Sequence, residues 1–452
     1  MAEVKASALD SETRTQQTSQ DMESQRGRDG VSDAKSFKES NAVIPAKAEN
    51  VVDWDGPNDP ANPMNWSSAK KFRAIGMVSL ITFLSPLAST IISPAAPDVM
   101  KTFHSTNETL EAFVTSIYVL AYAFGPLFLA PLSESIGRAP VYNACNFVFL
   151  VFSIACAVAQ KLSSLIVFRF LAGVGASCPI TIGAGTIADM VPREKRGVAM
   201  AAYIMGPLIG PTIGPLIGGY LAQSMGWRWI FWLMSILVSS NTFKENSILT
   251  TVQAAAVCVL TFLFMRESYA YIILERKTHR LRKKTGNPNL RSALDTGKAP
   301  IDLFKFSIMR PLKMLLLSPI VFLMSLYMAI VYGYVYLLFT TYPRVFQGQY
   351  GFSNGSIGLT YLGSGIGSFF GLTICGAVSD RLVTALTKRN GGIAKPEYRV
   401  PPMFVGSLLI PTGLFIYGWT AENKVHWMVP IFGTGLLGAG LFFLYVGHAT
   451  RY

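Results

Sequence analysis

Ten long apolar blocks dominate the chain and constrain its fold more than any other feature. Several exceed the roughly 18 apolar residues that indicate a membrane-spanning helix. The blocks are continuously apolar rather than alternating, which favours helices over a β-barrel, because a helix satisfies its own backbone groups in lipid. The chain is therefore predicted to be an all-α polytopic membrane protein. The predicted spans are 74–97, 111–131, 141–159, 165–187, 198–222, 229–265 (interrupted), 314–339, 356–375, 401–420 and 428–447.

The polar segments divide these spans into regions of different composition. Residues 1–70 are rich in Ser, Gln, Asp and Glu and predict a disordered tail. No short apolar core of a cleaved signal peptide is present in this tail, so the first span is expected to act as the insertion signal. A six-helix bundle is expected over 71–265, a basic linker over 266–313, and an incomplete C-terminal bundle of four spans over 314–452.

The charge distribution indicates topology. Only 14% of the residues are charged, against roughly 25% in soluble domains, which excludes a typical cytosolic enzyme. The net charge of +13 would fit a nucleic-acid partner, yet residues 1–69 hold 7 Lys/Arg and 12 Asp/Glu. With a cytosolic N-terminus, 21 Lys/Arg lie on inner joints and 5 on outer joints. Because basic residues are retained on the cytoplasmic side, the N-terminus is predicted to be cytosolic and no nucleic-acid partner is expected.

Motifs of several other protein classes are missing from the sequence. The five cysteines form no CxxC pair, the four histidines have no ligand spacing, and no GxxxxGK[ST] loop occurs. A metal site, a disulfide framework, an ATP-driven pump and an enzyme are therefore not predicted. Two Asn-x-Ser/Thr sequons on outer joints, at Asn107 and Asn354, predict glycosylation, with chance occurrence as the alternative.

A short motif occurs in two copies after apolar spans. The first runs Ala130-Pro-Leu-Ser-Glu-Ser-Ile-Gly-Arg138 and the second Gly376-Ala-Val-Ser-Asp-Arg381. Here the chain resembles the major facilitator superfamily, and more closely its fungal drug:H⁺ antiporters of the twelve-span type. The resemblance implies a carrier of two helical bundles, and a charge network that holds one conformation and breaks as the bundles rock. Ordinary solvated loop charges are the alternative. The implied latch residues are Glu134, Gly137, Arg138, Asp380 and Arg381, with Ser135 where the family usually has Arg.

An arginine, Arg169, lies near the start of the fourth span. A permanent cation in a membrane span is costly unless it faces a cavity or a partner. The surrounding Arg-Phe-Leu-Ala-Gly resembles a signature of the same family, which implies a role in proton coupling. The alternative is that the side chain snorkels to the outer interface.

The fifth span carries a Gly-Pro repeat. Glycine every four residues predicts a side-chain-free groove on one helix face, and each proline removes an internal hydrogen bond. The repeat resembles the antiporter signature of the family, which implies a seal of the central cavity against proton leak. A simple packing motif is the alternative. Its residues are Gly206, Pro207, Gly210, Pro211, Gly214, Pro215 and Gly218.

Several aromatic residues lie mid-span at helical spacing and would suit a planar or amphipathic substrate. Positions facing lipid or other helices are the alternative. These candidates are Tyr118, Tyr122, Phe124, Tyr332 and Tyr336.

Span six is interrupted by the polar stretch 238–253, and the apolar piece before it is too short to cross a bilayer core of about 30 Å. One hypothesis is a retained intron translated in frame; the other is a broken helix with an ion site at Lys244 and Glu245. The chain also ends after ten spans, where the resemblance implies two more.

These features together predict proton-coupled efflux of drugs or secondary metabolites by alternating access. The proton gradient would supply the energy without a cofactor, and the partners would be a small organic substrate, protons and the lipid bilayer. We expect a monomer in the plasma membrane, with the vacuolar membrane as a second location. The alternatives are a nutrient or polyamine uniporter or symporter, or a non-transporting product of a truncated or mis-spliced gene.

Overall fold

The computed structural model describes residues 50–192, 195–239, 266–295, 297, 300–391, 398 and 401–449. Three predictions fall wholly or mostly outside these residues: the disordered tail, the interruption at 238–253 with Lys244 and Glu245, and the last residues of the chain. Residues 50–70 of the predicted tail are described, and they contain the strand Val51–Val52, the short helix Pro63–Asn65 and the start of the first span at Ser68. Within the described residues the protein is helical apart from loops and one short parallel strand pair, β1 (Val51–Val52) with β2 (Arg291–Ser292).

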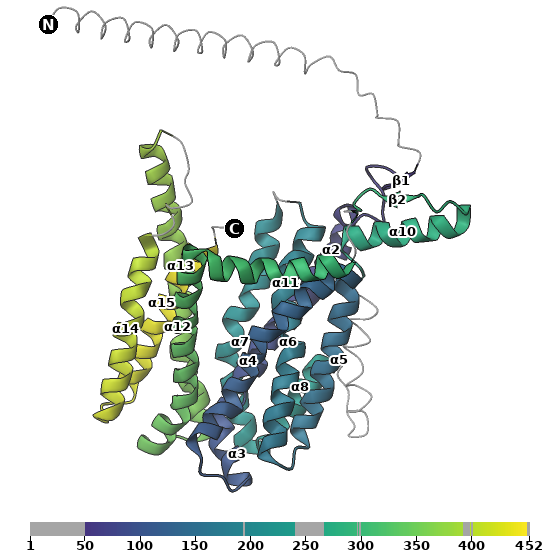
Figure 1. Cartoon of the computed structure of the whole chain (residues 1–452). Coiled ribbons are helices and arrows are strands. Elements are labelled where there is room, and N and C mark those ends of the chain that lie inside the picture. Colours follow the sequence, from purple (N-terminus) through teal and green to yellow (C-terminus); the bar gives the residue numbers. More distant parts are fainter. Residues whose placement is uncertain are drawn as a thin grey trace, which may run out of the picture.

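The first group of helices forms the bundle drawn in purple to teal in Figure 1. Its first span bends at Ser93–Ala95 (η2), where Pro94 lacks the N–H of a continuous helix. Buried aliphatic and aromatic side chains fill its interior. Its helices are α2 (Ser68–Thr90), α3 (Ala96–Thr102), α4 (Glu108–Ile136), α5 (Arg138–Ala157), α6 (Leu162–Met190), α7 (Arg196–Met225) and α8 (Arg228–Ser239).

The second group is smaller and has its own core, rich in tyrosine and phenylalanine. It lies beside the first bundle, and α13 packs along α7 over much of its length. Its helices are α12 (Pro319–Pro343), continued by the π-helix η4 (Arg344–Gln349), then α13 (Asn354–Arg389), α14 (Pro401–Glu422) and α15 (Met428–Ala449).

The all-α, two-bundle fold agrees with the prediction. Eight helices among the described residues are long and apolar enough to cross a membrane, and Arg228–Leu237 and Met428–Phe443 are shorter apolar helices. Nine of the predicted blocks overlap nine of these helices, and the described part of the tenth, 229–239 of the interrupted block, overlaps the short helix Arg228–Leu237. The described part of α8 ends at Ser239, and the rest of the predicted sixth span lies outside the described residues.

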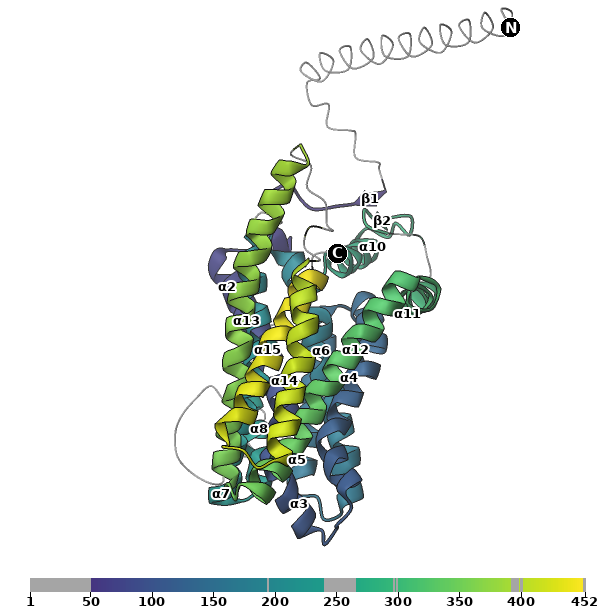
Figure 2. The ribbon, with the colours of Figure 1, turned by 90° about the vertical axis from the view of Figure 1, so that its left-hand side faces the viewer.

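The linker contains two helices, α10 (Ala270–Thr285) and α11 (Pro300–Leu317). We call the end of the bundles that carries them the linker end, and the opposite end, near α3, the far end. Figures 1 and 2 show α11 lying across the linker end at a steep angle to the spans. The predicted span start at 314 is four residues inside α11. The true break is at Ser318, after which Pro319 occupies the first turn of α12, where a missing N–H costs nothing.

Candidate functional site

A cavity of about 340 Å³ lies between the two bundles, lined by α6, α7, α12, α13 and α15. Its wall is largely aromatic and aliphatic, with a few hydroxyl groups. None of the described residues that line it carries a charge, so a charged ligand would lose its hydration there without an ion partner. Its aromatic and hydroxyl residues are Tyr203, Tyr332, Tyr336, Phe339, Tyr342, Phe442, Thr212, Ser364 and Ser368.

Two of the five predicted aromatic residues, Tyr332 and Tyr336, line this cavity. Both belong to a stripe on one face of α12, which continues through Phe339 to Tyr342 at helical spacing. Phe339 and Tyr342 were not predicted, although the same spacing could have identified them. Tyr203 on α7 was also missed, and its hydroxyl donates to the Pro179 carbonyl over 3.0 Å.

The other three predicted aromatic residues lie on α4 and do not line this cavity. The rings of Tyr118 and Tyr122 meet edge to face at 5.5 Å, and the Tyr122 hydroxyl lies 2.6 Å from the Ser85 hydroxyl on α2. Phe124 is 47% exposed and contacts Phe170 on the outer side of the bundle. Its position therefore corresponds to the alternative of a lipid-facing ring.

The Gly-Pro repeat of α7 faces two ways. Its glycines contact the backbone of α2: a Cβ on Gly206 would lie 2.9 Å from the Phe83 nitrogen, and one on Gly218 would lie 1.9 Å from the Ile91 carbonyl oxygen. Pro207 and Pro211 instead line the cavity. The predicted smooth groove is thus filled by α2. A side chain there would force the two helices apart.

A second glycine seam joins α7 to α13 across the two bundles. A Cβ on Gly219 would lie 2.3 Å from the Asn354 carbonyl oxygen, and one on Gly358 would lie 2.5 Å from that of Pro215. These close approaches fix the bundles together toward the far end.

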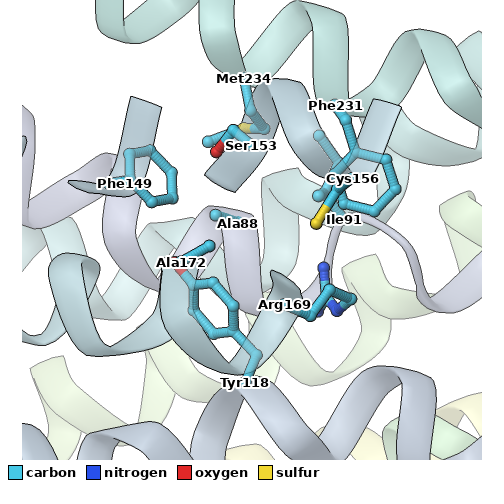
Figure 3. A pocket seen from close by; sticks show the side chains of 10 residues that line it. All are labelled: Ala88, Ile91, Tyr118, Phe149, Ser153, Cys156, Arg169, Ala172, Phe231 and Met234. Atoms are coloured by element: carbon cyan, nitrogen blue, oxygen red, sulfur yellow. The ribbon is translucent and has the colours of Figure 1, made fainter. Parts of the chain in front are cut away.

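The side chain of Arg169 is 2% exposed and lies inside the first bundle. It donates to the Ser89 carbonyl over 3.2 Å and stacks over the rings of Tyr118 and Phe231 at 5.1 and 5.8 Å. Its Nε has no hydrogen-bond partner among the described residues. Figure 3 shows it beside Tyr118 and below Cys156, at a cavity of only about 10 Å³. A snorkelling position would expose the guanidinium, whereas this one is enclosed.

Polar side chains cluster where α4 passes into α5 at the linker end. Arg138 pairs with Asp189 over 3.3 Å and donates to the Ser133 hydroxyl over 2.7 Å. Its backbone N–H donates to Glu267 over 2.9 Å. Between the helices, Gly137 adopts a φ of +105°, which favours glycine. Neither Asp189 nor Glu267 was predicted as a site residue. An acidic residue at the end of an apolar span could have identified Asp189.

The other members of the predicted latch lie apart from this cluster. Glu134 accepts a hydrogen bond from the Ser307 hydroxyl of α11 over 3.2 Å. Asp380 and Arg381 lie on α13, and neither forms an ion pair with another described residue. No ion pair therefore joins the two copies of the motif among the described residues in this conformation.

Ion pairs and hydrogen bonds join the bundles at the far end. Arg344 of η4 contacts Glu108 over 2.6 Å and Glu111 over 3.2 Å, both in the first turn of α4. The Asn354 side-chain amide donates to the carboxylate of Asp98. These contacts hold the far end closed.

The two sequons differ in accessibility. Asn107 is exposed and its side-chain oxygen caps α4, accepting from Thr109 N–H over 2.9 Å. Because the residue is exposed, it is accessible for a glycan, which attaches to the amide nitrogen. The amide nitrogen of Asn354 is engaged with Asp98 between the bundles.

Comparisons with known proteins agree with this architecture. The family model described as Major Facilitator Superfamily matches residues 78–450. The MFS-type transporter penM of Penicillium rubens is 53% identical over 404 residues, covering 89% of this chain and 76% of that protein. The efflux pump radE of Floropilus chiversii is 46% identical over 393 residues, covering 87% and 70%.

Solved structures share the fold at low sequence identity. The xylose transporter XylE from E. coli, in a partially occluded inward open conformation, matches with a TM-score of 0.59 and 14% identity, covering 85% of this chain and 84% of that one. A bacterial homolog of the human lysosomal transporter Spinster, in an inward-facing conformation, matches with a TM-score of 0.55 and 18% identity, covering 84% and 75%.

Proposed function

This chain belongs to the major facilitator superfamily and is a multi-pass membrane transporter, and we propose that it exports small neutral organic molecules in exchange for protons. The uncharged aromatic cavity between the bundles is the observation that carries the substrate class. One relative is named an efflux pump and another an MFS-type transporter, and these names support export as the direction of transport.

The size and lining of the cavity favour a neutral substrate with planar rings and few polar groups. Its volume of about 340 Å³ is within the range of about 300–1,000 Å³ that holds drug-sized ligands. Faces of Tyr336 and Phe339 suit planar rings, and the hydroxyls of Ser364 and Ser368 suit one or two hydrogen-bonding groups. A polyamine would need carboxylates, and none lines the described wall. The polyamine alternative is therefore disfavoured.

Transport by alternating access requires the two ends to open in turn. We assign the linker end to the cytosol, because the basic residues of the sequence gather there. In this assignment the Arg344 contacts with Glu108 and Glu111 close the outer side, and they must break for release. At the linker end, Glu134 and the Arg138 cluster would meet Asp380 and Arg381 when the inner side closes.

We assign Arg169 the role of linking the proton gradient to the cavity. Arginine stays protonated, so it acts as a fixed charge rather than a proton carrier. It holds the Ser89 carbonyl, and the Ser89 hydroxyl lies 3.2 Å from the Tyr336 hydroxyl, which borders the cavity. A ligand that displaces Tyr336 would thus alter the contacts of the buried cation.

Saturable binding of dyes to the full chain in nanodiscs tests the substrate class, with empty nanodiscs as background. We expect neutral Nile red to bind more tightly than cationic rhodamine 6G. The Ser368→Asp variant adds a carboxylate to the wall and should reverse this order, whereas Ser224→Asp, at the exposed far end of α7, should not. Tighter binding of rhodamine 6G to the unsubstituted protein would overturn the assignment.

Transcript sequencing across the codons for 238–253 tests the splicing hypothesis independently. We expect reads that lack these sixteen codons. If every read keeps them, the broken-helix hypothesis with Lys244 and Glu245 is favoured instead.

A further inference from the structure

Helix α11 has a free face on which basic and apolar side chains alternate. The opposite face packs on α4 and α12. Three cations on the free face are exposed: Lys305, Arg310 and Lys313. Between them lie Met309 at 50% exposure and Leu317 at 77%. A helix lying entirely in water would not gain from exposing these large apolar groups.

The depth of α11 follows from its connection to α12. Only Ser318 separates the two helices. The 25 residues of α12 span about 37 Å at 1.5 Å per residue, slightly more than a hydrocarbon core of about 30 Å. When α12 is placed across the hydrocarbon core, its start lies near the boundary between headgroups and acyl chains, and α11, which begins to turn away at Ser318, stays near the same depth. Both views show α11 crossing this end of the bundles (Figures 1 and 2).

We propose that α11 lies in the plane of the membrane and binds the headgroups of anionic phospholipids through Lys305, Arg310 and Lys313. Met309 and Leu317 enter the acyl region, while the basic side chains extend to the phosphate layer. A soluble acidic protein would complement the cations but not the apolar groups beside them at this depth. The hydrogen bond from Ser307 to Glu134 connects the lipid-binding helix to the predicted latch loop.

The experiment measures which lipid occupies the surface of α11. A bimane fluorophore on Met309→Cys in the full chain, in vesicles, is quenched by brominated phosphatidylserine or brominated phosphatidylcholine. The ratio of the two quenching curves gives the local preference for the anionic lipid. The unsubstituted protein, labelled in parallel, supplies the background from its own cysteines, of which the four among the described residues, Cys145, Cys156, Cys178 and Cys375, are buried.

A matched pair of charge-removal variants makes the test specific. Lys305→Gln with Arg310→Gln should reduce the preference for phosphatidylserine by about fivefold per cation removed, since each basic residue at an anionic surface contributes about 1 kcal/mol. Lys388→Gln with Arg389→Gln removes the same charges from the exposed end of α13, which projects beyond α11 (Figure 2), and should leave the preference unchanged.

Three results would overturn the proposal. Quenching of bimane by aqueous iodide but not by brominated lipid would place α11 in water. An unchanged preference for phosphatidylserine in the α11 variant would show that Lys305 and Arg310 do not bind the headgroups. An equal loss of preference in the α13 variant would show that the effect depends only on the overall charge of the protein. The vesicles have the same lipids in both leaflets, so the outcome does not depend on the orientation of the chain.

Discussion

The carboxylate of Glu267 accepts a hydrogen bond from the backbone N–H of Arg138 across 2.9 Å, although the two residues are 129 positions apart. It occupies the N-terminus of α5, where free N–H groups and the helix dipole favour an anion. Glu267 also accepts from the N–H of Tyr269, so the same carboxylate orders the start of the linker. The linker is thereby fixed to the loop between α4 and α5.

The glycine beside this contact should tolerate no side chain. A Cβ on Gly137 would lie 2.1 Å from a Glu267 oxygen, and the φ of +105° adds strain of about 1–3 kcal/mol. We expect Gly137→Ala to lower the thermal midpoint of the purified protein more than Gly286→Ala, which shares a positive φ but has open space around it. Equal losses would show that the Glu267 contact does not constrain this position.

The segment before α2 should loosen in acid. The N–H groups of Asp55 and Ala61 donate to Asp59, and these bonds hold the pKa of Asp59 below its usual 3.8. Because the folded pKa is lowered, the stabilisation is present above about pH 4 and is lost as the pH falls through the folded pKa. Hydrogen exchange of residues 50–66, corrected for intrinsic rates, should rise only below this range. Asp59→Asn should exchange faster at neutral pH, and a pH profile identical to that of the unsubstituted chain would contradict the assignment.

The two ends of α7 should respond oppositely to the same substitution. Gly218→Ala places a methyl group 1.9 Å from the Ile91 carbonyl oxygen and should destabilise by about 1–3 kcal/mol through overpacking. Gly197 has no neighbour within 4 Å of a Cβ, so Gly197→Ala should be neutral or stabilise by up to about 1 kcal/mol through helix propensity. Thermal unfolding of both variants measures the difference. Similar values for both would mean that α2 does not constrain α7.

Removal of the buried cation should separate stability from transport. Arg169 leaves one N–H without a partner among the described residues, and a buried charge without an ion partner carries a large desolvation cost that a methionine would not. We expect Arg169→Met to keep or raise the thermal midpoint while proton-driven transport falls at least about tenfold, a loss of about 1.4 kcal/mol. Full transport by this variant would exclude Arg169 from coupling.

The helices could be predicted from the sequence, whereas the contacts between residues far apart in the chain could not. Apolar block length located the apolar helices that the described residues contain, because a helix in lipid must be long and continuously apolar. Periodicity placed Tyr336 on one face of its helix but could not distinguish a face toward the cavity from a face toward lipid. Phe124 was therefore predicted to line the cavity as well. The acidic partners of Arg138, Asp189 and Glu267, come from α6 and the linker, and no local pattern encodes those distances. The Gly-Pro repeat predicted a smooth helix face, but only the fold shows that α2 fills it.

Proton counterflow tests the central claim most directly. The full chain is reconstituted in vesicles that contain a pH-sensitive dye and the neutral ligand that binds best in the nanodisc measurement, with Arg169→Met as the matched control. If the protein exchanges ligand for protons, ligand efflux acidifies the lumen in proportion to the ligand released, and both changes are at least about tenfold slower in the control. Efflux with no change of internal pH, or with alkalinisation, would contradict antiport.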